Sequence, residues 1–205
     1  MKVLMLNGSP RANGNTYTAL AEMKKIFDAE GIETEILQVG NMDIRGCTAC
    51  GKCERSKGCV FDDIVNVVAE KLEASDGLVL GSPVYYASAN PTLVALLDRL
   101  FYSSGKNYTM KVGASVLAAR RGGITAAFDE LNKFIVYHGM ALAGGQYWNG
   151  IHGRNPGEAA EDAEGLQQMR TLARNMVFLM KSIELGKEKY GLPEKEPWIG
   201  TNFIR

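Results

Sequence analysis

The chain has 205 residues, of which 46% are hydrophobic, enough to form the core of one large domain. Its 23 basic and 23 acidic side chains cancel, so we expect no strongly basic surface and no nucleic-acid partner. The chain contains no run of 18 apolar residues, and its first apolar stretch, 3–6, is too short for a signal peptide, so we expect a cytoplasmic protein without membrane-spanning segments.

Short apolar runs alternate with helical patterns along the whole chain. Strands are predicted at 2–7, 33–37, 77–81, 111–119 and 140–143, and helices at about 15–30, 62–74, 91–100, 124–138 and 158–185. Asn15, one of Asp62 and Asp63, and Asn90 stand where helix caps are expected. Strands that alternate with helices predict an α/β fold, in which a parallel sheet carries helices on both faces.

Three polar loops follow predicted strands, at 8–16, 82–90 and 120–123. In a parallel sheet with helices on both faces, ligands bind beyond the carboxyl ends of the strands, where the strand order reverses. The three loops would meet at that edge. We therefore expect the ligand site there.

The first loop reads NGSPRANGNT and joins a buried strand to a helix. It lacks the lysine of the nucleoside-triphosphate motif G-x-x-x-x-G-K-[ST] and the glycine spacing G-x-G-x-x-G of dinucleotide sites. Hydroxyl and amide groups remain, together with a helix start and one cation, and these favour a terminal phosphate monoester. The residues are Ser9, Arg11, Asn13, Asn15 and Thr16. Ordinary turn and cap chemistry is the alternative.

Three segments together carry a family resemblance: NGSPRANGNT after the first strand, GSPVYYASANPTLVALLDR after the third and RRGG after the fourth. The chain resembles the NAD(P)H-dependent FMN reductases of the flavodoxin-like superfamily over about residues 1–185. The resemblance implies one flavodoxin-like FMN-binding domain over 1–205, a three-layer sandwich around a five-stranded parallel sheet. A cysteine-rich insertion at about 40–61 and an irregular tail at about 188–205 are added to it.

The same resemblance implies which residues hold FMN. Ser9, Arg11, Asn13, Asn15 and Thr16 would contact the phosphate. Pro83, Val84, Tyr85 and Tyr86 would line the isoalloxazine ring, and Arg120, Arg121, Gly122 and Gly123 would approach its pyrimidine side. Either Arg120 or Arg121 would face the flavin. The alternative for the two tyrosines is that they only cover the core at the end of a strand. No catalytic side chain is expected, because the flavin carries the chemistry.

All four cysteines of the chain fall in one loop, with the spacing C-x2-C-x2-C-x5-C. They are Cys47, Cys50, Cys53 and Cys59. Such clustering argues against a disulfide framework, and the first three cysteines, with two gaps of two residues, match the opening of the bacterial ferredoxin motif. The loop resembles that of the iron–sulfur flavoproteins, which implies a [4Fe–4S] cluster. Zinc, or a loop of reduced thiols without metal, remain alternatives.

The two histidines have no carboxylate pattern beside them that would suggest a catalytic triad. His138 is expected at a helix end, where it interacts with the helix dipole. His152 shares a loop with Trp148, Asn149 and Arg154, and this loop could line a substrate pocket.

Three functions remain open at this point. The first is an FMN-dependent oxidoreductase that passes electrons from NAD(P)H to a small-molecule or protein acceptor. The second is an iron–sulfur flavoprotein that relays electrons between ferredoxin and FMN. The third is a flavin-binding redox sensor or scaffold without turnover. We also expect a homo-oligomer, a dimer or a tetramer, because the tail carries four large apolar residues that need a second surface: Trp198, Ile199, Phe203 and Ile204.

Overall fold

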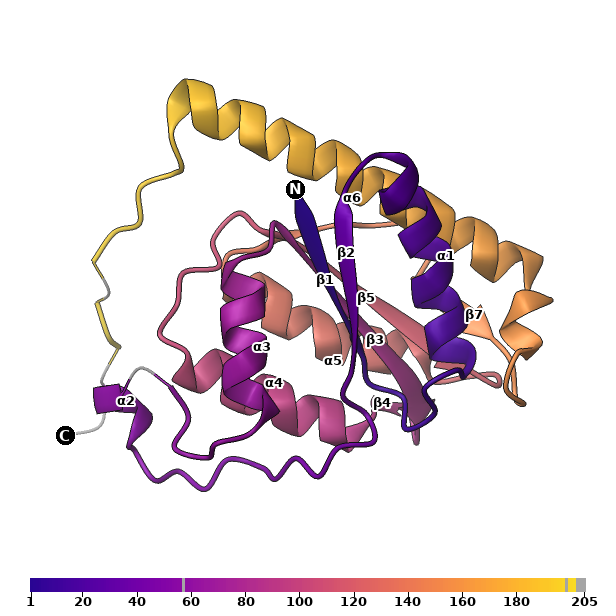
Figure 1. Ribbon diagram of the computed structural model, residues 1–205, viewed down its shortest axis with the longest axis horizontal. Coiled ribbons are helices and arrows are strands. Elements are labelled where there is room, and N and C mark those ends of the chain that lie inside the picture. Colours follow the sequence, from indigo (N-terminus) through magenta and orange to yellow (C-terminus); the bar gives the residue numbers. More distant parts are fainter. Residues whose placement is uncertain (57, 198, 202–205) are drawn as a thin grey trace.

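A parallel sheet forms the centre of the computed structural model, which describes residues 1–56, 58–197 and 199–201 (Figure 1). The strand order is β2, β1, β3, β5, β6, which confirms the predicted five-stranded parallel sheet. The strands are β1 (Lys2–Asn7), β2 (Glu33–Gln38), β3 (Gly77–Tyr85), β5 (Val112–Ala119) and β6 (Ala141–Leu142). The order reverses between β1 and β3, so their carboxyl ends lie at the predicted ligand edge.

The last position of the sheet is shared by two short strands. β6 pairs with the start of β5, and β7 (Gly150–His152) pairs with its end. β7 was not predicted from the sequence, because glycines and polar residues surround its single buried residue, Ile151. A third short strand, β4 (Ser88–Ala89), pairs antiparallel with the end of β3.

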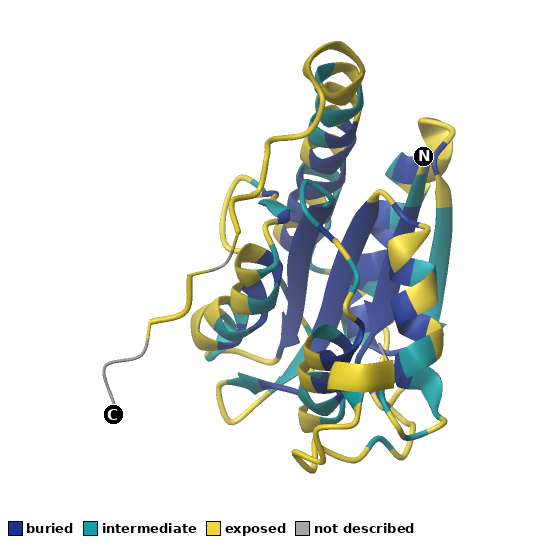
Figure 2. Cartoon of the chain, turned by 90° about the vertical axis from the view of Figure 1, so that its left-hand side faces the viewer, coloured by how far each residue is buried: buried dark blue, intermediate teal, exposed yellow. Residues whose placement is uncertain are grey.

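Helices cover both faces of the sheet (Figure 2). One face carries α1 (Asn15–Ala29) and α6 (Ala163–Tyr190), and the other carries α3 (Ile64–Glu73), α4 (Pro91–Ser103) and α5 (Ile124–Tyr137).

β1 shows how its sequence serves both layers of the core. Val3 and Met5 belong to the core under α1 and α6, whereas Leu4 and Leu6 belong to the opposite core. All four side chains are fully buried. Successive residues of a strand face opposite sides of the sheet, so a strand covered on both faces must be apolar throughout.

Two of the predicted helix caps are confirmed. The side chains of Asp63 and Asn90 each accept a hydrogen bond from the backbone N–H two residues on, at 3.1 Å and 3.2 Å. His138 directly follows α5, and its Nδ1 lies 2.8 Å from the carbonyl oxygen of Phe134, as expected of a helix-end residue.

The prediction that Asn15 caps α1 is wrong. The cap position belongs to Gly14, and Asn15 is the first helical residue. The Asn15 Oδ1 atom instead accepts a hydrogen bond from the backbone N–H of Ala159, at 3.1 Å. A partner 144 residues away cannot be inferred from the local pattern. As a result, α1 begins without a side-chain cap, and its first N–H groups stay available to a ligand.

The final helix begins later than predicted. Glu158–Ala160 form a separate 3₁₀ turn, η1, and the side chain of Asp162 then caps α6 through the N–H of Gly165, at 2.9 Å. The expected apolar face is present, with Met169, Leu172, Ala173 and Met176 fully buried and Leu166 and Leu179 packed at its border.

Beyond α6, the described residues 191–197 and 199–201 contain no helix or strand. Ile199 is 89% exposed. Trp198, Phe203 and Ile204, on which the expectation for the tail also depends, lie outside the described residues. No described helix combines the length and the apolar character that crossing a membrane requires.

Candidate functional site

A cavity of about 260 Å³ opens at the carboxyl ends of β1, β3 and β5. We call it the central cavity. Many of the residues predicted to hold FMN line it: Ser9, Arg11, Asn15, Thr16, Pro83, Val84, Tyr85 and Arg120. Gly153 and Arg154, which were not predicted for the flavin, also line it. Asn13 and Tyr86 are exposed and lie outside this lining.

Side chains at the ends of two neighbouring strands hold the first loop in place. Asn7 and Gln38 are paired in the register of β1 and β2, and the Asn7 Nδ2 atom donates to Gln38 Oε1 at 2.6 Å. Gln38 Nε2 donates to the carbonyl oxygen of Ser9 at 2.6 Å, and the N–H of Ser9 donates to Asn7 Oδ1 at 3.1 Å. This support was not predicted from the sequence, although two polar residues that end adjacent strands were a usable signal.

The first loop offers unused donors to an anion. The Thr16 side chain is 1% exposed, and no described residue hydrogen-bonds to its hydroxyl group. No described carboxylate lies within ion-pair distance of the guanidinium groups of Arg11, Arg120 or Arg154. These cations surround the uncapped start of α1, whose dipole also favours negative charge. The arrangement suits a phosphate group.

The segment 82–90 is not the open loop that we predicted. β3 continues to Tyr85, and a two-residue turn, Tyr86–Ala87, leads into β4. Both turn residues have positive φ, 51° and 62°, as a type I′ hairpin turn requires. Such turns favour Asn-Gly, and residues other than glycine, asparagine and aspartate are strained there. Strained backbone of this kind concentrates at functional sites.

Two contacts hold the strained turn. Glu130 Oε2 accepts hydrogen bonds from Ser88 Oγ and from the N–H of Ala89, both at 2.7 Å. On the other side, Gly123 has a φ of 95°, and a Cβ there would lie 2.9 Å from the Cα of Ala87. Only glycine can therefore stand at this point of the RRGG loop, which packs against the hairpin.

The two arginines of the RRGG loop line different cavities. Arg120 lines the central cavity, whereas Arg121, Gly122 and Gly123 line a neighbouring cavity of about 420 Å³. The structure therefore makes Arg120 the arginine nearer to the first loop.

The loop around His152 divides between the two cavities. Trp148 and His152 line the neighbouring cavity, and Arg154 lines the central one. Asn149 is fully buried, and its Nδ2 atom has no described partner. Contrary to expectation, a carboxylate does lie beside His152: Asp162 Oδ2 is 3.3 Å from its Nδ1 and accepts from its backbone N–H at 2.7 Å. The same carboxylate also caps α6, which was not predicted because the helix was expected to begin at residue 158.

A third cavity, of about 570 Å³, lies on the other side of the hairpin. It is lined by Tyr85, Tyr86, Asp98 and Glu130 and reaches Gly46, next to the first cysteine. Burial and then repulsion from Glu130 raise the pKa of Asp98 above its ordinary value. Asp98 therefore holds its proton to higher pH than an ordinary aspartate.

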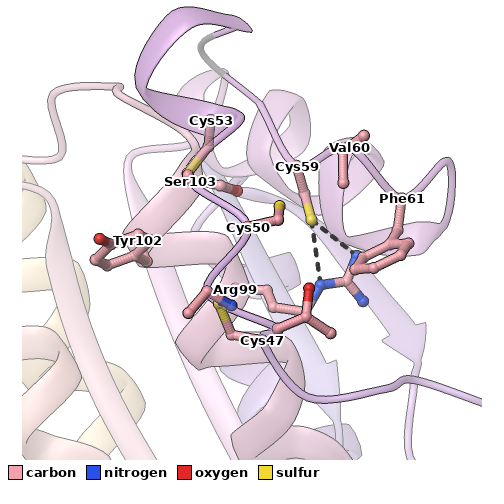
Figure 3. Close-up of a pocket in the computed structure, with 12 residues that line it drawn as sticks. Cys47, Cys50, Cys53, Cys59, Val60, Phe61, Arg99, Tyr102 and Ser103 are labelled. Carbon is pink, nitrogen blue, oxygen red and sulfur yellow. Dashed lines mark hydrogen bonds between the residues drawn. The ribbon is translucent and has the colours of Figure 1, made fainter.

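The four cysteines line one pocket, together with Arg99 and Phe61 (Figure 3). They are Cys47, Cys50, Cys53 and Cys59, and all four are free thiols. A backbone hydrogen bond from Lys52 lowers the pKa of Cys50. The segment between β2 and α3 contains only the four-residue helix α2 (Cys53–Ser56) among its described residues.

The side chains of this pocket are of the kind that binds a metal, but the space between them is small. Four thiols around one pocket fit an iron–sulfur cluster or zinc in kind. The free volume is only about 20 Å³, and no three described Cys, His, Asp or Glu side chains stand close enough to share a metal ion. The loop would therefore have to rearrange around a cluster.

The chain is similar to a known protein family and to proteins of known name. Residues 1–153 match the family of NADPH-dependent FMN reductases. An iron-sulfur flavoprotein of Methanocaldococcus jannaschii is 31% identical, over 90% of this chain and 100% of the relative. An iron-sulfur flavoprotein of Methanosarcina thermophila is also 31% identical, over 92% of this chain and 100% of the relative.

Solved structures share the fold at low sequence identity. The crystal structure of RosB, with a bound flavin-phosphate intermediate, superposes with a TM-score of 0.72 at 15% identity, over 100% of this chain and 92% of that one. An archaeal flavodoxin gives a TM-score of 0.60 at 14% identity, over 88% of this chain and 99% of that one. These likenesses confirm the predicted flavodoxin-like fold.

The strained turn gives a stability prediction. Ala87→Gly removes the Cβ that disfavours positive φ, so the free energy of unfolding should rise by about 0.5–1 kcal/mol. Ala89→Gly, in the paired strand β4, should instead lower it, because that residue is buried and gains nothing from glycine. Urea denaturation of the two variants and the parent measures both changes. A destabilised Ala87→Gly protein would contradict the assignment of strain.

Proposed function

The chain belongs to the NADPH-dependent FMN reductase family, and we propose that it is an FMN-dependent oxidoreductase that passes electrons from NAD(P)H to a small-molecule or protein acceptor. The observation that carries this proposal is the central cavity, where cations without a described carboxylate partner and an uncapped helix start meet a strained hairpin. Bound FMN would supply the chemistry by accepting a hydride and releasing electrons. The chain's own residues would bind and orient it.

The phosphate of FMN would lie at the first loop. Ser9 and Thr16 offer hydroxyl groups there, and Arg11 adds a cation. Asn15 also lines the cavity, and because its Oδ1 accepts from Ala159, its Nδ2 would be the atom that donates to the phosphate. The loop lacks the dinucleotide fingerprint, so FMN should bind in preference to FAD.

The isoalloxazine ring would lie between the end of β3 and the RRGG loop. Pro83, Val84 and Tyr85 line the cavity on one side, and Arg120 lines it on the other. A cation near the ring favours the reduced flavin, which is an anion. Tyr86, at the exposed tip of the hairpin, would cover the ring from its open edge or meet the acceptor.

A [4Fe–4S] cluster in the cysteine loop is the second part of the proposal. It is supported by the C-x2-C-x2-C-x5-C spacing, by the four free thiols around one pocket and by relatives named iron-sulfur flavoproteins. With a cluster, ferredoxin rather than NAD(P)H becomes a candidate donor. A flavin-binding sensor without turnover is the remaining alternative.

We also propose that the chain forms a homo-dimer or a tetramer. Ile199 in the tail is 89% exposed, and leaving large apolar side chains in water is costly. Light scattering of the purified protein measures the mass directly.

The donor test distinguishes the proposed functions. The protein, purified anaerobically with its flavin, is mixed with NADH, with NADPH or with reduced ferredoxin, and flavin bleaching is followed by stopped flow. Rapid bleaching by a nicotinamide is expected. Bleaching by ferredoxin alone would favour the relay function. Turnover with none of the three would leave the sensor.

Thr16→Val tests the phosphate site. The change removes a hydroxyl group from a buried position and keeps its shape. A hydrogen bond to a charged group contributes about 1.5–3 kcal/mol, so the affinity for FMN should fall at least about tenfold. Thr18→Val in the same helix is the matched control, because that hydroxyl hydrogen-bonds to the carbonyl oxygen of Gly14. Flavin fluorescence titration of the apoproteins gives both affinities, and an unchanged value for Thr16→Val would remove Thr16 from the site.

Cys59→Ala tests the cluster. Anaerobically purified or reconstituted protein should contain about four irons per chain, the number in a cubane held by four thiolates. Cys59→Ala should lose most of this iron, because the chain has no cysteine outside the loop to replace it. FMN should stay bound, since the central cavity contains none of the four cysteines. Iron-free wild-type protein after reconstitution would reject the cluster.

A further inference from the structure

One buried cation in the cysteine pocket has no part in the flavin site. Arg99 lies on α4, is 1% exposed and is surrounded along the helix by the buried residues Leu96, Leu97 and Leu100. Its Nη1 and Nη2 atoms donate to the two carboxylate oxygens of Asp63, at 2.7 Å and 3.0 Å. A buried guanidinium group is costly unless it is paired, and this bidentate pair offsets the cost.

Two further N–H groups of Arg99 are directed at one sulfur atom. Nε and Nη2 donate to the Sγ atom of Cys59, at 3.3 Å and 3.1 Å (Figure 3). Nη1 also donates to the carbonyl oxygen of Arg45, at 3.3 Å. An arginine that only joined α4 to the start of α3 would need the contacts to Asp63 alone. The two bonds from Arg99 to the Cys59 sulfur are not needed to join the helices, so they indicate a second role for this arginine.

Cys59 is the anchored member of the four cysteines. Its backbone N–H donates to Asn66 Oδ1 at 2.9 Å, and Asn66 Nδ2 donates back to its carbonyl oxygen at 3.0 Å. Cys47 and Cys50 are exposed and lie on a segment without helix or strand. Any rearrangement around a cluster therefore falls to those residues, while Cys59 keeps its place beside Arg99.

We propose that Arg99 is a positioning residue that holds the Cys59 sulfur as a cluster ligand and raises the reduction potential of the cluster. The inference rests on the proposed cluster. A reduced cluster carries one more electron, and hence one more negative charge, than the oxidised cluster. N–H groups directed at a ligand sulfur, and the charge behind them, stabilise the more negative state.

The matched pair Arg99→Lys and Arg45→Lys tests this. Both guanidinium groups stack on the Phe61 ring, at 5.0 Å and 4.7 Å from its centroid, and both variants keep a positive charge. Only Arg99 donates to Cys59. In holoprotein with four irons and bound FMN, EPR-monitored redox titration should give a lower midpoint potential for the cluster in Arg99→Lys. Arg45→Lys should keep the wild-type value.

Equal cluster potentials in the two variants, at equal iron content, would overturn the proposal. A purely structural Arg99 would change stability or iron content and leave the potential of the iron that remains unchanged. Wild-type protein that takes up no iron would reject the cluster itself, an outcome that the iron assay separates from a failure of Arg99.

A second measurement is made on the wild-type protein, with Arg45→Lys as its control. Wild-type holoprotein labelled with ¹⁵N-arginine, with its cluster reduced, should show hyperfine coupling from a guanidinium nitrogen in pulsed EPR. Arg45→Lys should keep that coupling. Absence of any arginine nitrogen coupling in wild-type protein that contains four irons would overturn the proposal.

Discussion

The parallel register of β1 and β3 is the constraint on which the rest of the structure depends. It places Asn7 beside Gly81, so the chain leaves both strands at the same edge of the sheet. The N–H of Gly8 then donates to the carbonyl oxygen of Gly81 at 2.7 Å, and Asn90 Nδ2 donates to the carbonyl oxygen of Gly8 at 2.6 Å. These bonds satisfy backbone groups that would otherwise be buried without partners. The first loop and the start of α4 are thereby joined before any ligand binds.

The bonds between the first loop and the start of α4 also stabilise the neighbouring β3–β4 hairpin, whose turn is strained. Positive φ at two residues with a Cβ costs on the order of 1–3 kcal/mol each, and only strong surrounding contacts maintain it. Glu130 holds one strand of the hairpin, Gly123 admits the turn from the other side, and Asn90 anchors the chain directly after β4. Both strained residues are exposed, and Tyr86 is fully open to solvent.

The sequence predicted those parts of the molecule that local patterns determine. The strands β1, β2 and β5, and the caps at Asp63 and Asn90, follow from apolar runs and from side chains that bond two residues away. The missed features depend on partners far along the chain. The Asn15 side chain accepts a hydrogen bond from the backbone N–H of Ala159. The Asp162 side chain caps α6 and also accepts a hydrogen bond from the backbone N–H of His152. Arg99 had a local signal, a charge among inward leucines, but its partners Cys59 and Asp63 become visible only when α3 and α4 pack together.

Helix α4 connects the two candidate sites. Its cap, Asn90, reaches the first loop, and Arg99 reaches the cysteine pocket. Nine residues of α-helix span roughly 14 Å, so the helix separates the two contacts by about that length and holds them rigidly. The outer side of the same helix, with Pro91, Val94, Ala95 and Asp98, lines the third cavity, which extends from the hairpin tyrosines to Gly46 beside the first cysteine. Helix α4 therefore forms one wall of the space between the β3–β4 hairpin and the residue that precedes the first cysteine.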